Sequence, residues 1–318
     1  MRLARLRRSF YDASMASIRV GNAPCSWGVM GGYDAALYPP YTQVLDEIAA
    51  AGYTGTELGD WGYLPTGARQ LRDELAARDL SMIGALVPIP LEDRAAHAAG
   101  LADALRTARL LAAVASDDAP PPFVVLADAN GSNPARVQNA GRIGPEHGLS
   151  DEQWAAFGEG AAAIARAVRD ETGLRTVFHH HCGGYVETPA ETARLMELTE
   201  AGDLGLCFDT GHWALGGGDV IEAFDRYRER IWHVHFKEYH ADVARQMRSE
   251  GWDYFEGLAK RVFHRPGTGD VDFPALLAAM RSSGYDGWVV VEDELPPGDG
   301  NPEESARADR EYLAGLGL

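Results

Sequence analysis

Short apolar runs rich in β-branched residues alternate along the chain with longer segments in which alanine and leucine recur at helical spacing. The apolar runs predict eight strands, at residues 18–24, 54–59, 81–87, 123–127, 175–181, 204–209, 231–236 and 288–292. The intervening segments predict eight helices, near residues 41–51, 68–78, 94–114, 151–171, 190–200, 220–230, 273–283 and 304–313. Strict alternation of strands and helices is typical of parallel βαβ units.

Eight such units in 318 residues favour a single-domain α/β fold, the (β/α)8 TIM barrel, over a doubly wound sheet. No GxGxxG motif follows the first strand, so we expect no nucleotide cofactor. Residues 239–268 are too long for a plain loop, and we expect this inserted segment to carry a helix over the barrel mouth. The barrel would span residues 17–318. Residues 1–16 would form a mobile tail or lie upstream of a start at Met15.

Charge and cysteine content narrow the functional classes. The chain has 47 acidic and 29 basic residues, a formal net charge of -18, which argues against binding to nucleic acid or to an anionic membrane surface. No apolar run approaches the length of a transmembrane helix. Cys25, Cys182 and Cys207 are scattered and form no CxxC motif, so we expect no disulfide framework and a reducing, cytoplasmic location.

Polar side chains gather where the predicted strands end, which is where TIM barrels carry their function. The fifth strand ends in three histidines, of which His179 and His181 share one face because side chains alternate along a strand. The other strand ends supply Glu57 and Asp60, Asp209 and His212, His233 and His235 followed by Lys237, and Glu292 followed by Glu294. Imidazoles together with carboxylates suit a divalent transition metal. The best single ligand set is His179 or a neighbour with Asp209, His235 and Glu292.

Several of these residues also have a structural interpretation. We expect His180 and His233 to be hydrogen-bonded core residues, although a register shift of one would exchange His180 with His179. Trp27, Trp61 and Trp213 follow predicted strand ends, and they would either wall a sugar-sized pocket or simply close the top of the barrel. Cys25 and Cys182 lie near the same mouth, but no adjacent base marks either as a nucleophile.

Seven motifs resemble those of the xylose isomerase-like sugar isomerase/epimerase superfamily, and within it most closely the inosose dehydratase branch. They are GNAPCSWG, TELGDWGYLP, HHHCGG, CFDTGHWALGGGD, HVHFKE, RPGTGDVDF and GYDGWVVVEDE. The resemblance implies one divalent metal ion, Mn or Co before Zn, Fe or Mg, held by side chains from strands 5 to 8. Asp209, His235 and Glu292 match three of the superfamily's ligands, whereas His179 stands where the superfamily usually has glutamate. His212 matches a position that contacts substrate or supports the metal.

The resemblance further implies proton abstraction next to the carbonyl of a cyclic polyol ketone or keto sugar, most directly dehydration of 2-keto-myo-inositol. Sugar isomerisation or epimerisation and β-elimination of 3-keto glycosides would use the same parts. A metal-dependent phosphodiesterase would need a basic mouth, and a sugar-binding barrel without activity would need no metal set. The roles expected are proton transfer by Lys237 or His181, orientation of hydroxyls by Glu57, and substrate contacts from His212, Trp27, Trp61, Trp213 and Glu294. The resemblance also allows a homo-oligomer.

Overall fold

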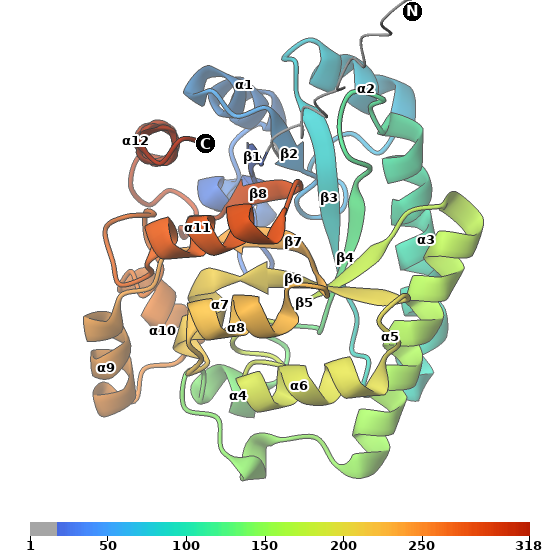
Figure 1. The fold of residues 1–318 in the computed structure, drawn as a ribbon, viewed down its shortest axis with the longest axis vertical. Coiled ribbons are helices and arrows are strands. Elements are labelled where there is room, and N and C mark those ends of the chain that lie inside the picture. The colour runs from blue at the N-terminus through green and yellow to red at the C-terminus, as the bar shows by residue number, and fades with distance from the viewer. Residues whose placement is uncertain (1–17) are drawn as a thin grey trace, which may run out of the picture.

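Eight parallel strands close into a barrel in the computed structural model, which describes residues 18–318 (Figure 1). The strands follow one another around the barrel in chain order and are β1 (Arg19–Asn22), β2 (Gly55–Glu57), β3 (Ser81–Pro88), β4 (Phe123–Ala127), β5 (Thr176–His179), β6 (Leu204–Asp209), β7 (Ile231–Phe236) and β8 (Trp288–Val291). The predicted (β/α)8 barrel is therefore confirmed. The expectation of a mobile tail at 1–16 falls outside the described residues.

Long helices surround the strands, and each occupies a segment in which the sequence predicts a helix (Figure 1). They are α1 (Tyr41–Ala51), α2 (Ala68–Ala76), α3 (His97–Val114), α5 (Asp151–Thr172), α6 (Pro189–Leu198), α8 (Val220–Tyr227), α11 (Phe273–Ser283) and α12 (Pro302–Gly315). Four further helices are α4 (Pro134–Gln138), α7 (Thr210–Leu215), α9 (Ala241–Glu250) and α10 (Tyr254–Ala259). In the part of the chain that is described, no helix is long and apolar enough to span a membrane.

Alternation along the strands separates the hydrophobic core from the site. On β6, Leu204, Leu206 and Phe208 belong to the large apolar cluster that the helices share, so they face outward from the barrel. Cys207 packs instead with Val125 and Val177 of neighbouring strands inside the barrel. Because successive side chains point to opposite faces, a polar residue two positions beyond Cys207 also points inward, at the open end.

The pairing register brings the strand ends together. His179 on β5 pairs with Cys207 on β6, and Asp209 on β6 pairs with His235 on β7. His235 in turn pairs with Val290, two residues before Glu292. Residues that are far apart in sequence thus meet at the carboxyl end of four consecutive strands.

The segment between β7 and α11 contains α9 and α10 rather than a single helix. Its apolar residues form a second core with the loops that follow β4, β5 and β6, made up of Ala140, Cys182, Leu215, Ala244, Met247, Tyr254, Leu258, Val262 and Phe263. This packing places α10 against the carboxyl end of the barrel.

Candidate active site

A cavity of about 180 Å³ opens at the carboxyl end of the barrel. Its polar wall contains Glu57, His179, His181, His235, Glu292 and Glu294. Its other walls are mostly apolar and include Val29, Met30, Leu86, Pro88, Phe255 and Leu258. A small molecule with one polar edge and a less polar body would match this lining.

Three side chains of the polar wall and the fully buried Asp209 beside them form the cluster that the sequence predicts as a ligand set. One ligand atom from each of His179, Asp209, His235 and Glu292 lies within 4.8 Å of the others, and all four residues are buried. His235 Nδ1 lies 3.3 Å from Glu292 Oε1, and His179 Nε2 lies 3.6 Å from Asp209 Oδ2. His179 Nε2, Asp209 Oδ2 and His235 Nδ1 have no hydrogen-bond partner in the described structure. Buried polar atoms without hydrogen-bond partners are costly, and their convergence on one point suits a bound ligand.

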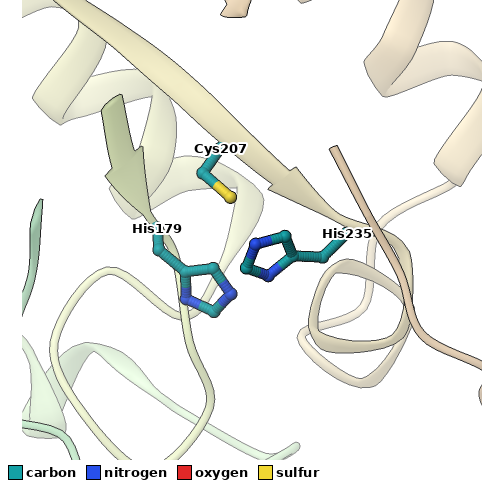
Figure 2. Close-up of side chains that lie close together, drawn as sticks. All are labelled: His179, Cys207 and His235. Carbon is teal, nitrogen blue, oxygen red and sulfur yellow. The ribbon is translucent and has the colours of Figure 1, made fainter. Parts of the chain in front are cut away.

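Cys207 lies beside this cluster and points its sulfur toward the rings of His179 and His235 (Figure 2). Burial raises the pKa of its thiol to about 12. A metal binds the thiolate rather than the thiol, so the carboxylate of Asp209, two residues nearer the mouth, is the better donor.

Glu57 lies behind His235 and fixes the orientation of that ring. Its Oε1 accepts hydrogen bonds from His233 Nε2 at 2.7 Å and from His235 Nε2 at 3.1 Å. Burial by itself raises the pKa of this carboxyl group, but the two histidines outweigh burial and lower it to about 2. With Nε2 donating to Glu57, the other nitrogen of His235 is left to face the cluster. His233 is thereby the hydrogen-bonded core residue that the sequence predicts.

Lys237 is fully buried among carboxylates. Its Nζ lies 2.7 Å from Glu292 Oε2, 3.0 Å from Glu294 Oε1 and 3.5 Å from Asp209 Oδ2. Burial disfavours the charged ammonium, yet the three carboxylates hold the pKa of Lys237 well above its usual value. In this arrangement Lys237 carries a positive charge and does not accept a proton.

A second polar cluster lies beside the first and involves His181, His212 and Glu294. Both histidine Nε2 atoms lie 3.5 Å from Glu294 Oε1. The other oxygen of Glu294 accepts a hydrogen bond of 2.7 Å from the hydroxyl of Tyr254 on α10. Sequence reasoning missed Tyr254. The available signal was the aromatic pair Tyr254–Phe255 in the inserted segment expected to cover the mouth.

The three tryptophans do not form the wall of this cavity, which corrects their assignment as substrate contacts. Trp27 is buried and donates its indole N–H to Glu47 Oε2, and Trp213 donates to the backbone oxygen of Asp219. Trp61 is 38% exposed, under a guanidinium group on α3. Tyr254 and Phe255 supply the aromatic wall instead.

His180 faces the helices, as the alternation predicts. Its Nε2 accepts a hydrogen bond from the backbone N–H of Asp209, and its ring packs against Phe208 and Trp213. His179 is therefore the histidine of the triplet that points into the barrel with Asp209 and His235. Burial raises the pKa of both Cys25 and Cys182 well above the usual value, so neither is a ready nucleophile.

The family model described as "Xylose isomerase-like TIM barrel" matches residues 45–316. The chain belongs to this family. The match covers β2 to β8 of the barrel, and the resemblance noted from the motifs is confirmed.

Curated relatives align with almost the whole of this chain. An inosose dehydratase of Lacticaseibacillus casei is 31% identical over 302 residues, which is 93% of this chain and 96% of the relative. A rhizopine catabolism protein of Rhizobium meliloti is 33% identical over 95% of this chain and 89% of its own. Among solved structures, a 3-keto-D-glucoside 4-epimerase of E. coli superposes with a TM-score of 0.62 at 18% identity, over 94% of this chain and 99% of its own. The last likeness shows the shared fold.

Proposed function

We propose that this chain is a divalent-metal-dependent enzyme that removes the proton next to the carbonyl of a cyclic polyol ketone, and that its reaction is inosose dehydration. The family membership and the inosose dehydratases among its relatives support an enzyme of this dehydratase or sugar isomerase/epimerase kind. The observation that carries the proposal is the cluster of His179, Asp209, His235 and Glu292, whose atoms converge on a cavity of small-molecule size.

The residues present fit a divalent cation. Asp209, Glu292 and Glu294 contribute three carboxylates and Lys237 one ammonium group, which leaves two net negative charges in a buried site. Two imidazoles in the donor set favour Mn, Co, Fe or Zn over Mg, and we place Mn or Co first. His179, Asp209, His235 and Glu292 would hold the ion. When bound, it supplies a Lewis acid that polarises a carbonyl oxygen.

His181 is the side chain best placed to take the proton. Its Nδ1 lies 2.6 Å from the backbone oxygen of Cys182, which can only accept, so Nδ1 carries the hydrogen. In the neutral imidazole Nε2 then carries the lone pair, and the ring lines the cavity. Glu294, 3.5 Å from that nitrogen, stabilises the imidazolium that forms. Lys237 holds the carboxylates of Glu292 and Glu294 in place, and its positive charge favours the negative charge that develops on the substrate.

The test uses 2-keto-myo-inositol in heavy water, with protein stripped of metal and then resupplied with Mn or Co. We expect metal-dependent loss of one water from the substrate, and mass spectrometry would detect it. His235→Ala and His179→Ala should show no activity. His97→Ala is the matched control, because His97 lies on α3 and its ring packs near Gly160 of α5.

Two other outcomes would revise the proposal. Deuterium uptake without loss of water would show an isomerase or epimerase that shares the proton-abstraction step. Absence of any reaction with either metal would reject 2-keto-myo-inositol as the substrate, and 3-keto glycosides would then be assayed. Activity that survives in both His235→Ala and His179→Ala would disprove the role of the cluster.

A further inference from the structure

Tyr254 reaches the cavity from outside the barrel. It is the first residue of α10, it is 5% exposed, and its ring packs in the second core beside Cys182 and Leu258. Its hydroxyl donates to Glu294 Oε2 at 2.7 Å and lies 3.4 Å from His181 Nε2. Gly183 closes around the ring, since a Cβ there would lie 3.2 Å from Tyr254 Cγ. The phenol is therefore held firmly against the polar wall.

Loss of water from a polyol ketone needs an acid as well as a base, because hydroxide leaves poorly without a proton. Both oxygens of Glu294 are already occupied as acceptors, Oε2 by the Tyr254 hydroxyl at 2.7 Å and Oε1 by the Lys237 ammonium group at 3.0 Å. The Lys237 ammonium group is engaged by three carboxylates and does not line the cavity. Tyr254 does line it. Burial and the charge of Glu294 raise the pKa of Tyr254 well above its usual value, so its hydroxyl keeps its proton.

We propose that Tyr254 is the catalytic acid that protonates the departing hydroxyl group, and that Glu294 is the positioning residue that aims it. This inference rests on the proposed dehydratase function. It assigns the second stage of that reaction, the departure of the hydroxyl group, to a residue of the inserted segment. The two clusters on the polar wall then divide the reaction. The cluster of His179, Asp209, His235 and Glu292 acts at the carbonyl end of the substrate. Glu294 and Tyr254 act at the carbon that loses its oxygen.

The step balances without an added reagent. The base removes the α proton, and the electron pair of that C–H bond passes toward the carbonyl to give an enolate. In the second stage this electron pair returns to form the new C=C bond. The C–O bond at the next carbon breaks, and its electron pair leaves with the oxygen, which takes the Tyr254 proton and departs as water. The phenolate then regains the proton that the base removed. Lys237, 3.0 Å from Glu294, keeps the carboxylate beside the phenolate partly neutralised in the interval.

The decisive experiment compares two rates in Tyr254→Phe, which keeps the ring and removes only the hydroxyl. Water loss from 2-keto-myo-inositol should fall by about 10²–10⁴-fold, the usual contribution of a positioned acid. Metal-dependent deuterium uptake at the α carbon should persist, because its base and metal residues are intact. Tyr33→Phe is the matched control, since Tyr33 packs edge-on against Phe255 and its loss of a hydroxyl should change neither rate.

A second substrate distinguishes a catalytic role of the Tyr254 hydroxyl from a role in shaping the cavity. In the 2-keto-myo-inositol analogue with fluorine in place of the departing hydroxyl, fluoride leaves without protonation. Tyr254→Phe should eliminate fluoride at nearly the wild-type rate if the missing proton is its only defect. A parallel fall of water loss, fluoride loss and deuterium uptake, or no fall in any of them, would overturn the assignment of Tyr254. Failure of the wild-type protein to exchange or eliminate would instead disprove the proposed function.

Discussion

Glu57 fixes two imidazole rings with a single carboxylate oxygen. Hydrogen bonds from His233 and His235 converge on its Oε1, so the ring of His235 cannot rotate without breaking a buried charge-assisted bond. A carboxylate behind a metal-binding histidine orients the ring and raises its basicity. Glu57 therefore acts on the candidate metal cluster from behind, in addition to lining the cavity.

Glu57→Gln should weaken metal binding. The amide keeps the size of the carboxylate but loses its charge and one acceptor oxygen, so we expect metal affinity to fall by about 10–100-fold. Competition with a chelator for Co would measure this. Glu171→Gln, on the exposed surface of α5 opposite Arg109, is the control and should leave affinity unchanged. Equal affinity in Glu57→Gln and wild type would show that His235 needs no orienting partner.

The residues that sequence analysis located best are those whose direction a strand dictates. Alternation alone points His179, Asp209 and His235 inward and His180 outward, and the structure has this arrangement. Trp27 and Trp213 lie beyond the strand ends, in the 3-10 helix Pro24–Trp27 and in α7, where strand periodicity no longer sets the direction of a side chain. Tyr254 depends on the packing of an inserted helix, which no local pattern specifies.

At the scale of elements, the junction of β6 and α7 explains the sequence Asp-Thr-Gly-His. Asp209 ends β6 and also caps α7, with Oδ1 accepting from the backbone N–H of His212 at 2.8 Å while Oδ2 faces the candidate ligand cluster. Gly211 lies against the end of β7, where a Cβ would come within 2.7 Å of Lys237 Cγ and 2.8 Å of the backbone oxygen of Glu238. One short turn thus makes Asp209 both a helix cap and a candidate ligand, and brings it next to the backbone at Lys237.

Gly211→Ala should force β7 and α7 apart. Because one clashing atom belongs to the backbone, relief requires movement of the segment that follows β7 and carries Lys237, and we expect the free energy of unfolding to fall by about 1–3 kcal/mol. Denaturant titration would measure it, with activity falling in parallel. In Gly202→Ala the new Cβ meets no atom within 4 Å, so that control should stay within about 0.5 kcal/mol of wild type. A stable, fully active Gly211→Ala would contradict this account.

The strands and long helices were predictable because each repeats a clear period over many residues. The sequence identified no separate helix at α4 (Pro134–Gln138) or at α7 (Thr210–Leu215). Both are too short to show a period and depend on their caps, since Asn133 and Asp209 accept hydrogen bonds from the first turns. The inserted segment was expected to hold a helix, but its division into α9 and α10 follows from packing on loops that are distant in sequence.

At the scale of the whole molecule, the barrel buries a negatively charged centre that folding has to tolerate. Three carboxylates face one ammonium group there, and the chain as a whole carries a formal net charge of -18. A divalent cation that binds the folded protein and not the unfolded chain would relieve the repulsion between these carboxylates. Metal binding would then raise the stability of the fold.

Metal removal should therefore lower the thermal midpoint of unfolding, and resupplied Mn or Co should restore it. A free metal concentration 100 times the dissociation constant should add about 2.7 kcal/mol of stability. Differential scanning calorimetry of stripped and reloaded protein would measure the shift. His179→Ala, which removes one ligand of the set, should lose most of that response. A thermal midpoint that changes neither with chelator nor with added metal would contradict a metal site in the folded protein.

The position of the inserted segment has a consequence for how such enzymes diversify. Both ends of residues 239–268 join the barrel between β7 and α11, so the segment interrupts none of the strands that bring His179, Asp209, His235 and Glu292 together. Tyr254, Phe255 and Leu258 all arrive with it. Changes confined to this one stretch would alter the aromatic wall of the cavity and leave those four side chains in place.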